Sequence, residues 1–323
     1  MSLKPENRAI HAATNLIHRL SVVGVVLFGF LSLATFVEFD NTLLLGVVPL
    51  APWLFLASAL VFALLKNRVL VLAIGIAASG VIALSSPGSA LPGANCSVVE
   101  GASGTSTVVY SHNVLFGRAD ADEVASQIAD VAADIVLLQE AVPSFMERIT
   151  PLLEDYPHVM ADGYQAVFSR FEISDTDRAF DDRNVLGLLD TRIETSEGPL
   201  RVINVHATPP HIPGGRDEQV EQFASLRAAF AIDDAELPVL AMGDFNATPF
   251  DSRYRSLAAD GVVDAHDAVG CGIGVSWSPL QGFGPALLGL DHALSSGAEA
   301  EVFEILDYAG SDHKGIAVAI SFS

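Results

Sequence analysis

Six apolar runs in the second two-thirds of the chain end in polar or titratable side chains. The clearest example is AMGDFNATPFDS (residues 241–252), where Asp244 and Asn246 follow a run of apolar residues. Short apolar runs bounded by turn residues predict buried strands. Strand ends on one edge of a sheet converge, so residues far apart in the sequence can share a pocket. The other strand-end residues are Asn113, Glu140, His206, Asp291 with His292, and Asp312 with His313.

These residue types suit phosphoryl chemistry. Carboxylate and amide oxygens are the ligands that a hard divalent cation such as Mg²⁺ prefers, and histidines beside the cation can donate protons to a phosphate or stabilise its charge. Each residue also has an ordinary explanation: Glu140 as a plain strand end, His206 as a core residue, Asp244 and Asn246 as turn formers, and Asp312 as a cap. The set as a whole favours chemistry, because all of its members fall at strand ends.

Strand-like and helix-like segments alternate from residue 107 onward. The later strands follow one another without helices between them, which predicts mixed or antiparallel sheets in one domain of a little over 200 residues. Helices are predicted over residues 120–133, 144–156 and 216–231. Strands are predicted over residues 106–113, 134–140, 164–171, 184–193, 200–208, 237–246, 289–296, 301–308 and 315–323.

The first 84 residues have a different composition and predict a membrane anchor. A bilayer requires about 20 apolar residues per helix, and three segments satisfy or approach this, at about residues 20–38, 42–65 and 69–86. A cleaved signal peptide followed by core helices fits less well, because the three segments have no globular sequence between them. Basic flanks stay in the cytoplasm, which predicts a cytoplasmic N-terminus and an extracytoplasmic C-terminal domain. The basic flanking residues are Lys4, Arg8, Arg19, Lys66 and Arg68.

Residues 85–106 are rich in Gly, Ser, Ala and Pro and predict a flexible tether to a domain at residues 107–323. From residue 85 onward there are 12 Lys and Arg against 36 Asp and Glu. This charge repels polyanions and disfavours duplex nucleic acid as a partner. Cys96 and Cys271 could pair outside the cell or stay as two unpaired thiols, and the sequence leaves both open.

The order of the strand-end motifs resembles the endonuclease/exonuclease/phosphatase superfamily over about residues 107–323. The resemblance implies an α/β (α+β) fold, a four-layer α/β/β/α sandwich with helices outside two packed mixed sheets. The matching words are SHNVLFG, DIVLLQE, FSR, NVHAT, GDFNATP, LDHAL and SDHKG.

The same resemblance implies metal ligands. Glu140 would be the principal ligand of Mg²⁺ or Mn²⁺, with Asn113 beside it, and Asp312 would bind or neighbour a metal. Two positions receive no role: His292 is expected to pack, and Tyr164 matches only loosely a tyrosine that some family members use.

Catalytic roles follow from the resemblance as well. Asp244 would position and deprotonate the attacking water, and Asn246 would hold that water or a phosphate oxygen. His206 would donate to the phosphate. His313 would contact the phosphate too, oriented by Asp291.

The function implied is that of a metal-dependent phosphoric ester hydrolase. Three short apolar spans before such a domain resemble bacterial membrane-anchored members associated with teicoplanin resistance, for which a lipid-linked cell-envelope intermediate is the implied substrate. An extracytoplasmic nuclease and a non-catalytic membrane module that retains the fold are the alternatives. The oligomeric state, the number of metals and the choice between monoester and diester are not set by the sequence.

Overall fold

The computed structural model describes residues 5–34, 50–66, 97–179, 186–231, 237–258, 261–269, 274–280 and 284–322. The chain divides into two units, Met1–Ser86 and Pro87–Ser323. Cys96, Cys271 and the whole of the predicted third span (residues 69–86) lie outside the described residues. The pairing of the cysteines and the membrane insertion of the span stay predictions.

The N-terminal unit contains two described helices, α1 (Pro5–Ala34) and α3 (Ala51–Lys66), which include most of the first two predicted spans. They pack closely: a Cβ on Gly24 would touch Ser58, and the rings of His18 and Phe62 stack with centroids 5.1 Å apart. Within the described part of the chain, no helix combines the length and the apolar character that crossing a bilayer requires. The three-helix anchor therefore stays a prediction.

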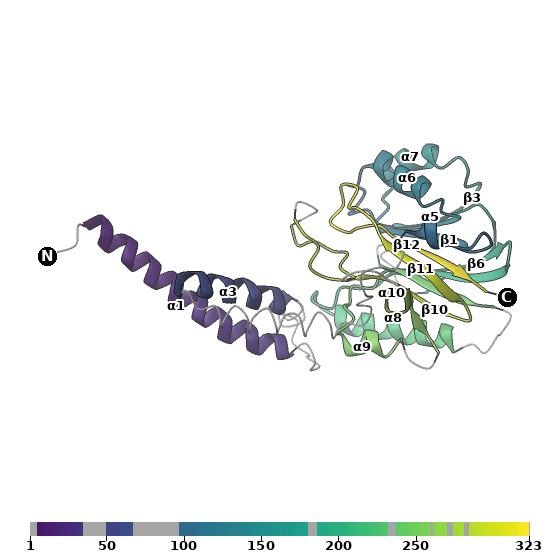
Figure 1. Ribbon diagram of the computed structural model, residues 1–323. Helices are drawn as coiled ribbons and strands as arrows, with labels where there is room; N and C mark the ends of the chain where they lie inside the picture. The colour runs from purple at the N-terminus through teal and green to yellow at the C-terminus, as the bar shows by residue number, and fades with distance from the viewer. Residues whose placement is uncertain are drawn as a thin grey trace. The chain divides into compact units, whose positions relative to one another are not determined.

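The C-terminal unit is built on two six-stranded mixed sheets, as the sequence predicts. The first sheet has the order β11-β12-β1-β2-β4-β3, and α6 (Ala121–Asp130) and α7 (Pro143–Ile149) lie along its outer side (Figure 1). Helix α6 begins where the Asp120 side chain accepts hydrogen bonds from two backbone N–H groups of the first turn. The strands are β1 (Thr107–Asn113), β2 (Ile135–Gln139), β3 (His158–Asp162), β4 (Gln165–Ser169), β11 (Glu299–Ile305) and β12 (Ile316–Ser321).

The second sheet has the order β5-β6-β7-β8-β10-β9. Helices α8 (Gly215–Phe230) and α9 (Ser252–Arg255) lie on its outer side (Figure 1). A short helix, α10 (Ala265–Val269), follows β9, and the ring of its His266 lies edge-on to the ring of Phe303 in β11. The strands are β5 (Glu172–Ala179), β6 (Gly187–Thr195), β7 (Gly198–His206), β8 (Val239–Asp244), β9 (Val263–Asp264) and β10 (Asp291–Ser296).

Both sheets share one internal pattern that matters for the site. β1 and β2 are parallel and connected through α6, and β7 and β8 are parallel and connected through α8. Antiparallel strands flank each central pair. The carboxyl ends of each parallel pair meet at one edge of their sheet, which is where an α/β sheet places ligands.

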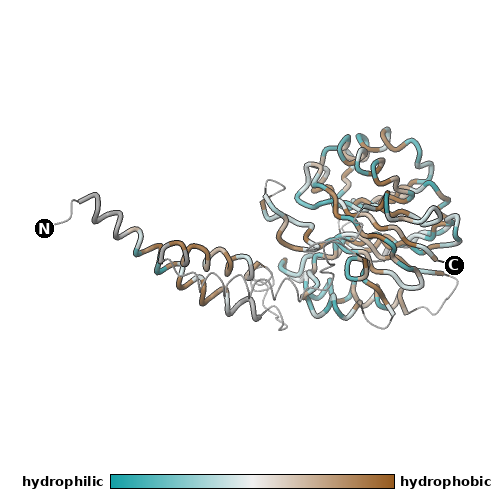
Figure 2. The backbone as a smooth tube through the Cα atoms, in the orientation of Figure 1, coloured by the Kyte–Doolittle hydropathy of each residue, from teal (hydrophilic) through white to brown (hydrophobic). Residues whose placement is uncertain are grey.

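Apolar side chains fill the space between the sheets and beneath the helices, and Figure 2 shows hydrophobic residues along the strands of this unit. Buried polar side chains connect the two sheets. Asn204 of β7 is fully buried and donates to the carbonyls of Leu138 (3.0 Å) and Ala166 (3.1 Å) in the other sheet. Its Oδ1 accepts a hydrogen bond from Gln139 at 2.7 Å. These bonds are lost if one sheet shifts, so they fix how the sheets face each other.

The end of the predicted tether belongs to the domain. A one-turn helix, α5 (Val98–Gly101), lies beside β11, where Val98 is buried and its N–H donates to Glu304 at 2.8 Å. The Ser103 N–H and the Ser106 hydroxyl donate to Glu301. Residues 97–106 are therefore packed and hydrogen-bonded, which corrects the expectation of a free linker up to residue 106.

Candidate active site

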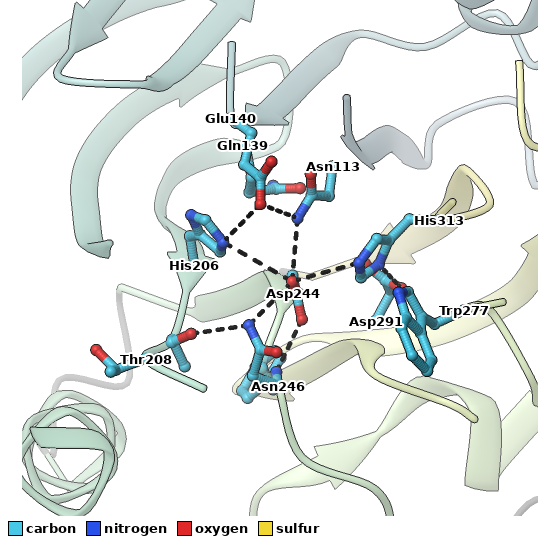
Figure 3. A network of polar contacts seen from close by, with 12 residues as sticks. Asn113, Gln139, Glu140, His206, Thr208, Asp244, Asn246, Trp277, Asp291 and His313 are labelled. Carbon is cyan, nitrogen blue, oxygen red and sulfur yellow. Dashed lines mark hydrogen bonds and ion pairs between the residues drawn. The ribbon is translucent and has the colours of Figure 1, made fainter. Parts of the chain in front are cut away.

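The predicted site residues meet where the two sheets face each other (Figure 3). Asn113 ends β1, Glu140 follows β2, His206 ends β7, and Asp244 ends β8. A hydrogen bond joins the two sheets within the site: Asn113 Nδ2 of the first sheet donates to Asp244 Oδ2 of the second at 3.1 Å. The structure thus brings together residues 131 positions apart in the chain.

Glu140 stands at a backbone position of positive φ (57°), which turns its carboxylate away from the strand and toward the site. Its Oε2 accepts the Phe116 N–H at 2.8 Å, and its Oε1 accepts from Asn113 Nδ2 at 3.2 Å. His206 Nε2 lies 3.5 Å from Oε1. Burial raises the pKa of Glu140, but hydrogen bonding to His206, with its charge, outweighs burial, and the net pKa is lowered. The residue is therefore a carboxylate at neutral pH.

The loop that holds Glu140 is conformationally strained. Leu115, Phe116 and Gly117 follow one another with φ of 50°, 47° and 70°. Such non-glycine conformations cost about 1–3 kcal/mol each and are concentrated at functional sites. The Arg148 guanidinium of α7 donates to the Gly117 carbonyl and holds the turn in place.

Asp244 lies at the centre of the polar network (Figure 3). Its Oδ1 accepts the Asn246 N–H at 2.8 Å, and its Oδ2 accepts from Asn246 Nδ2 at 3.1 Å. His206 Nε2 is 3.8 Å from Oδ2 and His313 Nε2 is 3.7 Å from the same atom. Burial raises the pKa of Asp244 above its ordinary value, against the opposing charge of His313. A carboxylate with a raised pKa is a better proton acceptor than an ordinary one.

His313 and Asp291 form a buried ion pair beside Asp244. His313 Nδ1 is 2.8 Å from Asp291 Oδ2, and the Ser276 hydroxyl donates to the same oxygen at 2.6 Å. Burial lowers the pKa of His313, but the charges of Asp291 and then Asp244 outweigh it and raise the pKa to about 10. For Asp291, burial raises the pKa, and the charge and hydrogen bond of His313 bring it below its ordinary value. His313 is therefore a cation at neutral pH.

The oxygen-rich part of this network around Glu140 fits a divalent cation. Glu140 Oε1 and Asp244 Oδ2 converge on the same Asn113 amide group, and carboxylate oxygens are hard ligands. Among the described residues, Asp244, Asp291 and His313 also bring one ligand atom each within 4.8 Å of one another. His313 is a cation at neutral pH, and a metal-binding histidine must be neutral, so this second group fits catalysis better than a metal.

Asp312 stands apart from the other predicted ligands. Its Oδ2 accepts from Trp277 Nε1 at 3.2 Å, and its Oδ1 is buried with no hydrogen-bond partner among the described residues. No hydrogen bond or ion pair within the described chain links its carboxylate to Glu140 or Asn113. A metal role for Asp312 stays a prediction.

His292 packs, as expected. Its Nε2 lies 2.9 Å from the Ala247 carbonyl, and its ring lies 4.2 Å from that of Tyr254, centroid to centroid.

Sequence reasoning missed the residues that hold the predicted ones in place. Ser276 and Trp277 lie in a loop without strand or helix periodicity, and both bind site carboxylates. Gln139, which donates to Ser111 and Asn204, was missed as well. The one available signal was position, since Gln139 directly precedes a strand-end carboxylate.

Comparisons with known proteins agree with this geometry. Residues 110–313 match the Endonuclease/Exonuclease/phosphatase family. No curated protein matches the sequence. A truncated TDP2 from Caenorhabditis elegans has a similar fold, with 22% identity, a TM-score of 0.55, and coverage of 68% of this chain and 98% of that chain. An endonuclease/exonuclease/phosphatase family protein from Bacteroides thetaiotaomicron is 16% identical, with a TM-score of 0.56 and coverage of 68% of this chain and 98% of that chain. SmcL is 18% identical, with a TM-score of 0.52 and coverage of 67% of this chain and 99% of that chain.

Proposed function

Because the chain belongs to the endonuclease/exonuclease/phosphatase family, we propose that it hydrolyses a phosphate ester with a divalent metal ion, Mg²⁺ or Mn²⁺. The observation that carries the proposal is the position of Asp244, with the His206 nitrogen at the end of β7 3.8 Å away and the His313 nitrogen in the segment before β12 3.7 Å away. A buried carboxylate between two histidines and next to Glu140 has few structural explanations and a direct chemical one.

Glu140 and Asn113 are the residues that would hold the cation, which when bound withdraws charge from the phosphate oxygens. The lowered pKa of Glu140 supports this role, since a metal ligand must be ionised. Asp312 is proposed to bind or neighbour a metal.

The side chains of the site then have separate roles in the hydrolysis. Asp244 accepts the proton of the attacking water, and the Asn246 amide orients that water or a phosphate oxygen. His313, held cationic by Asp291, stabilises negative charge that grows on the phosphate in the transition state. His206 donates to the phosphate from the other side.

We further propose that the enzyme is anchored in a membrane, with its N-terminus in the cytoplasm and the catalytic unit outside. The helix pair α1 and α3 supports this. Small residues such as Ser21 and Ala59 are buried between the helices, while Leu20, Val26 and Leu64 are exposed. Large apolar side chains outside and small ones inside are typical of helices that face lipid.

A membrane anchor and a strongly acidic domain together favour a lipid-linked cell-envelope phosphate as substrate. The rival is an extracytoplasmic nuclease. One structural neighbour, TDP2 from D. rerio, is known in complex with a single-stranded DNA product, but the excess of acidic residues here opposes a polyanion. A non-catalytic module is disfavoured by the converging strand ends, for which a protein without activity has no use.

The function is tested by assaying purified full-length protein with Mg²⁺ against p-nitrophenyl phosphates, a polyprenyl pyrophosphate, a glycerophospholipid, a sphingophospholipid and plasmid DNA. Hydrolysis of the lipid-linked substrate that stops in EDTA and in Glu140→Gln supports the proposal. Preferred cleavage of DNA selects the nuclease, and no hydrolysis of any substrate selects the non-catalytic module.

Topology is tested separately by adding protease to intact spheroplasts. The catalytic unit should be digested from outside. A unit that stays protected until lysis would reverse the proposed orientation.

A further inference from the structure

Helix α8 presents two glutamines to the interior of the protein. Gln219 and Gln222 are both 0% exposed, although glutamine is rarely fully buried. They are three residues apart and therefore lie on one face of the helix. Helix α8 connects β7 to β8, so these side chains lie beside the ends of the two strands that carry His206 and Asp244.

Gln219 holds the turn after Asp244. Its Nε2 donates to the carbonyls of Phe245 and Asn246, each at 3.1 Å. Asn246 has a left-handed backbone (φ 47°), so this turn needs support from its surroundings. The Asn246 side chain in turn donates to the Ala207 carbonyl at 2.9 Å and to Asp244.

Gln222 holds the segment after His206. Its Oε1 accepts the Thr208 N–H at 2.8 Å, and its Nε2 donates to the Thr208 hydroxyl at 3.0 Å. One face of α8 is thus hydrogen-bonded to the chain just beyond both catalytic strand ends.

The Gln219 amide is kept at a cost. The Gln219 Oε1 is buried and has no hydrogen-bond partner among the described residues. Leaving such an acceptor unsatisfied costs about 1–3 kcal/mol. The helix retains the amide despite this cost, and what the amide supplies is two hydrogen bonds to the Asn246 turn.

We propose that Gln219 is a positioning residue for hydrolysis: it fixes the left-handed turn at Asn246, which keeps the Asn246 amide aimed at Asp244. This inference rests on the proposed function, because the catalytic value of that aim exists only if Asp244 and Asn246 act on a substrate. Gln222 serves as the matched neighbour, since it holds Thr208 and makes no hydrogen bond to the Asn246 turn.

The test compares Gln219→Met, which keeps the length of the side chain and removes both donors, with Leu226→Ala, a buried core variant on the same helix. Gln219→Met is expected to lower kcat about 10- to 100-fold with KM within about twofold, as for other losses of positioning. Leu226→Ala is expected to lower Tm and leave kcat unchanged well below Tm.

A double-mutant cycle identifies the route of the effect. If Gln219 acts through Asn246, then Gln219→Met adds little to the loss of kcat caused by Asn246→Ala. Additive losses, or a kcat of Gln219→Met within twofold of wild type, would overturn the inference. If Gln219→Met does not fold, Gln219→Ala serves instead, because it removes the donors and leaves space for water to reach the two carbonyls.

Hydrogen exchange measured by mass spectrometry gives a readout that does not need a substrate. Gln219→Met should speed exchange in the peptide covering residues 244–248, whereas Gln222→Met should act on residues 206–210. If wild type shows no hydrolysis, the proposed function fails, and this exchange pattern alone decides whether Gln219 holds the turn. Unchanged exchange at residues 244–248 would refute the positioning.

Discussion

His313 Nδ1 lies 2.8 Å from Asp291 Oδ2, in a place where both side chains are buried. The opposite ring nitrogen, Nε2, faces Asp244 at 3.7 Å. One imidazole thus lies between two carboxylates, and its charge depends on both of them. This arrangement makes the stability of the folded domain depend on pH.

The stability contributed by the pair should be lost on the alkaline side. His313 has a folded pKa of about 10, above the ordinary 6.5, so its contribution is complete below about pH 6.5 and declines as pH rises toward 10. The pKa of Asp291 is lowered, so its contribution is present at neutral pH and is lost in acid. Urea unfolding in EDTA should show a larger stability difference between wild type and His313→Gln at pH 6 than at pH 10. An equal difference at both values would contradict the ion pair.

Asp244→Asn separates a turn residue from a proton acceptor. Asparagine also favours turns, but its amide cannot accept a proton from water at neutral pH. Turnover should fall by at least about 10², with metal binding retained and Tm close to that of wild type. His313→Ala should also lose activity, and the two losses should not add if both groups act on one transition state. Wild-type turnover in Asp244→Asn would return the residue to a structural role.

Glu140→Gln should release the metal without unfolding the domain. The substitution keeps the shape and the acceptor for the Phe116 N–H, and it removes the charge that a hard cation needs. Binding of Mn²⁺, followed by the EPR signal of the free ion, should weaken by more than about tenfold, and hydrolysis should cease. Full activity of the wild type in EDTA would exclude a metal-dependent reaction altogether.

Gly117→Ala tests the strained loop. A Cβ there would lie 2.7 Å from a Val142 methyl carbon and 2.9 Å from the Phe145 Cβ, at a backbone φ of 70°. Destabilisation of about 1–3 kcal/mol is expected. Mn²⁺ binding should also weaken, because the neighbouring Phe116 supplies the N–H that holds the Glu140 carboxylate. Gly104→Ala is the control, since a Cβ there meets nothing within 4 Å. Equal unfolding free energies for the two variants would mean that the loop adapts without strain.

The central part of the fold could be predicted because it depends on local pattern. The apolar runs that end in Asn113, Glu140, His206 and Asp244 are buried strands, and the rule that strand ends share an edge brings their last residues together. Strand β5 (Glu172–Ala179) was not predicted, because six of its eight residues are polar or charged and the alternation is weak. Strand β3 (His158–Asp162) was missed for a similar reason, since it is only half-buried.

The supporting residues could not be predicted from the sequence. A glutamine on a helix has the same periodicity whether it faces solvent or two carbonyl groups, so Gln219 looked like an ordinary polar position. Ser276 binds Asp291 only because a loop returns to the end of β10. Such roles depend on long-range packing, which leaves no mark on the local pattern.

The last strand of the chain, β12, lies between β11 and β1 in the interior of the first sheet. His313 stands three residues before it. During synthesis, β1 leaves the ribosome about 200 residues before its neighbour β12 is made, so one edge of β1 stays unpaired until then. A nascent chain that has not reached His313 therefore lacks both a closed first sheet and a histidine of the candidate site, so the proposed site is complete only once β12 has been synthesised.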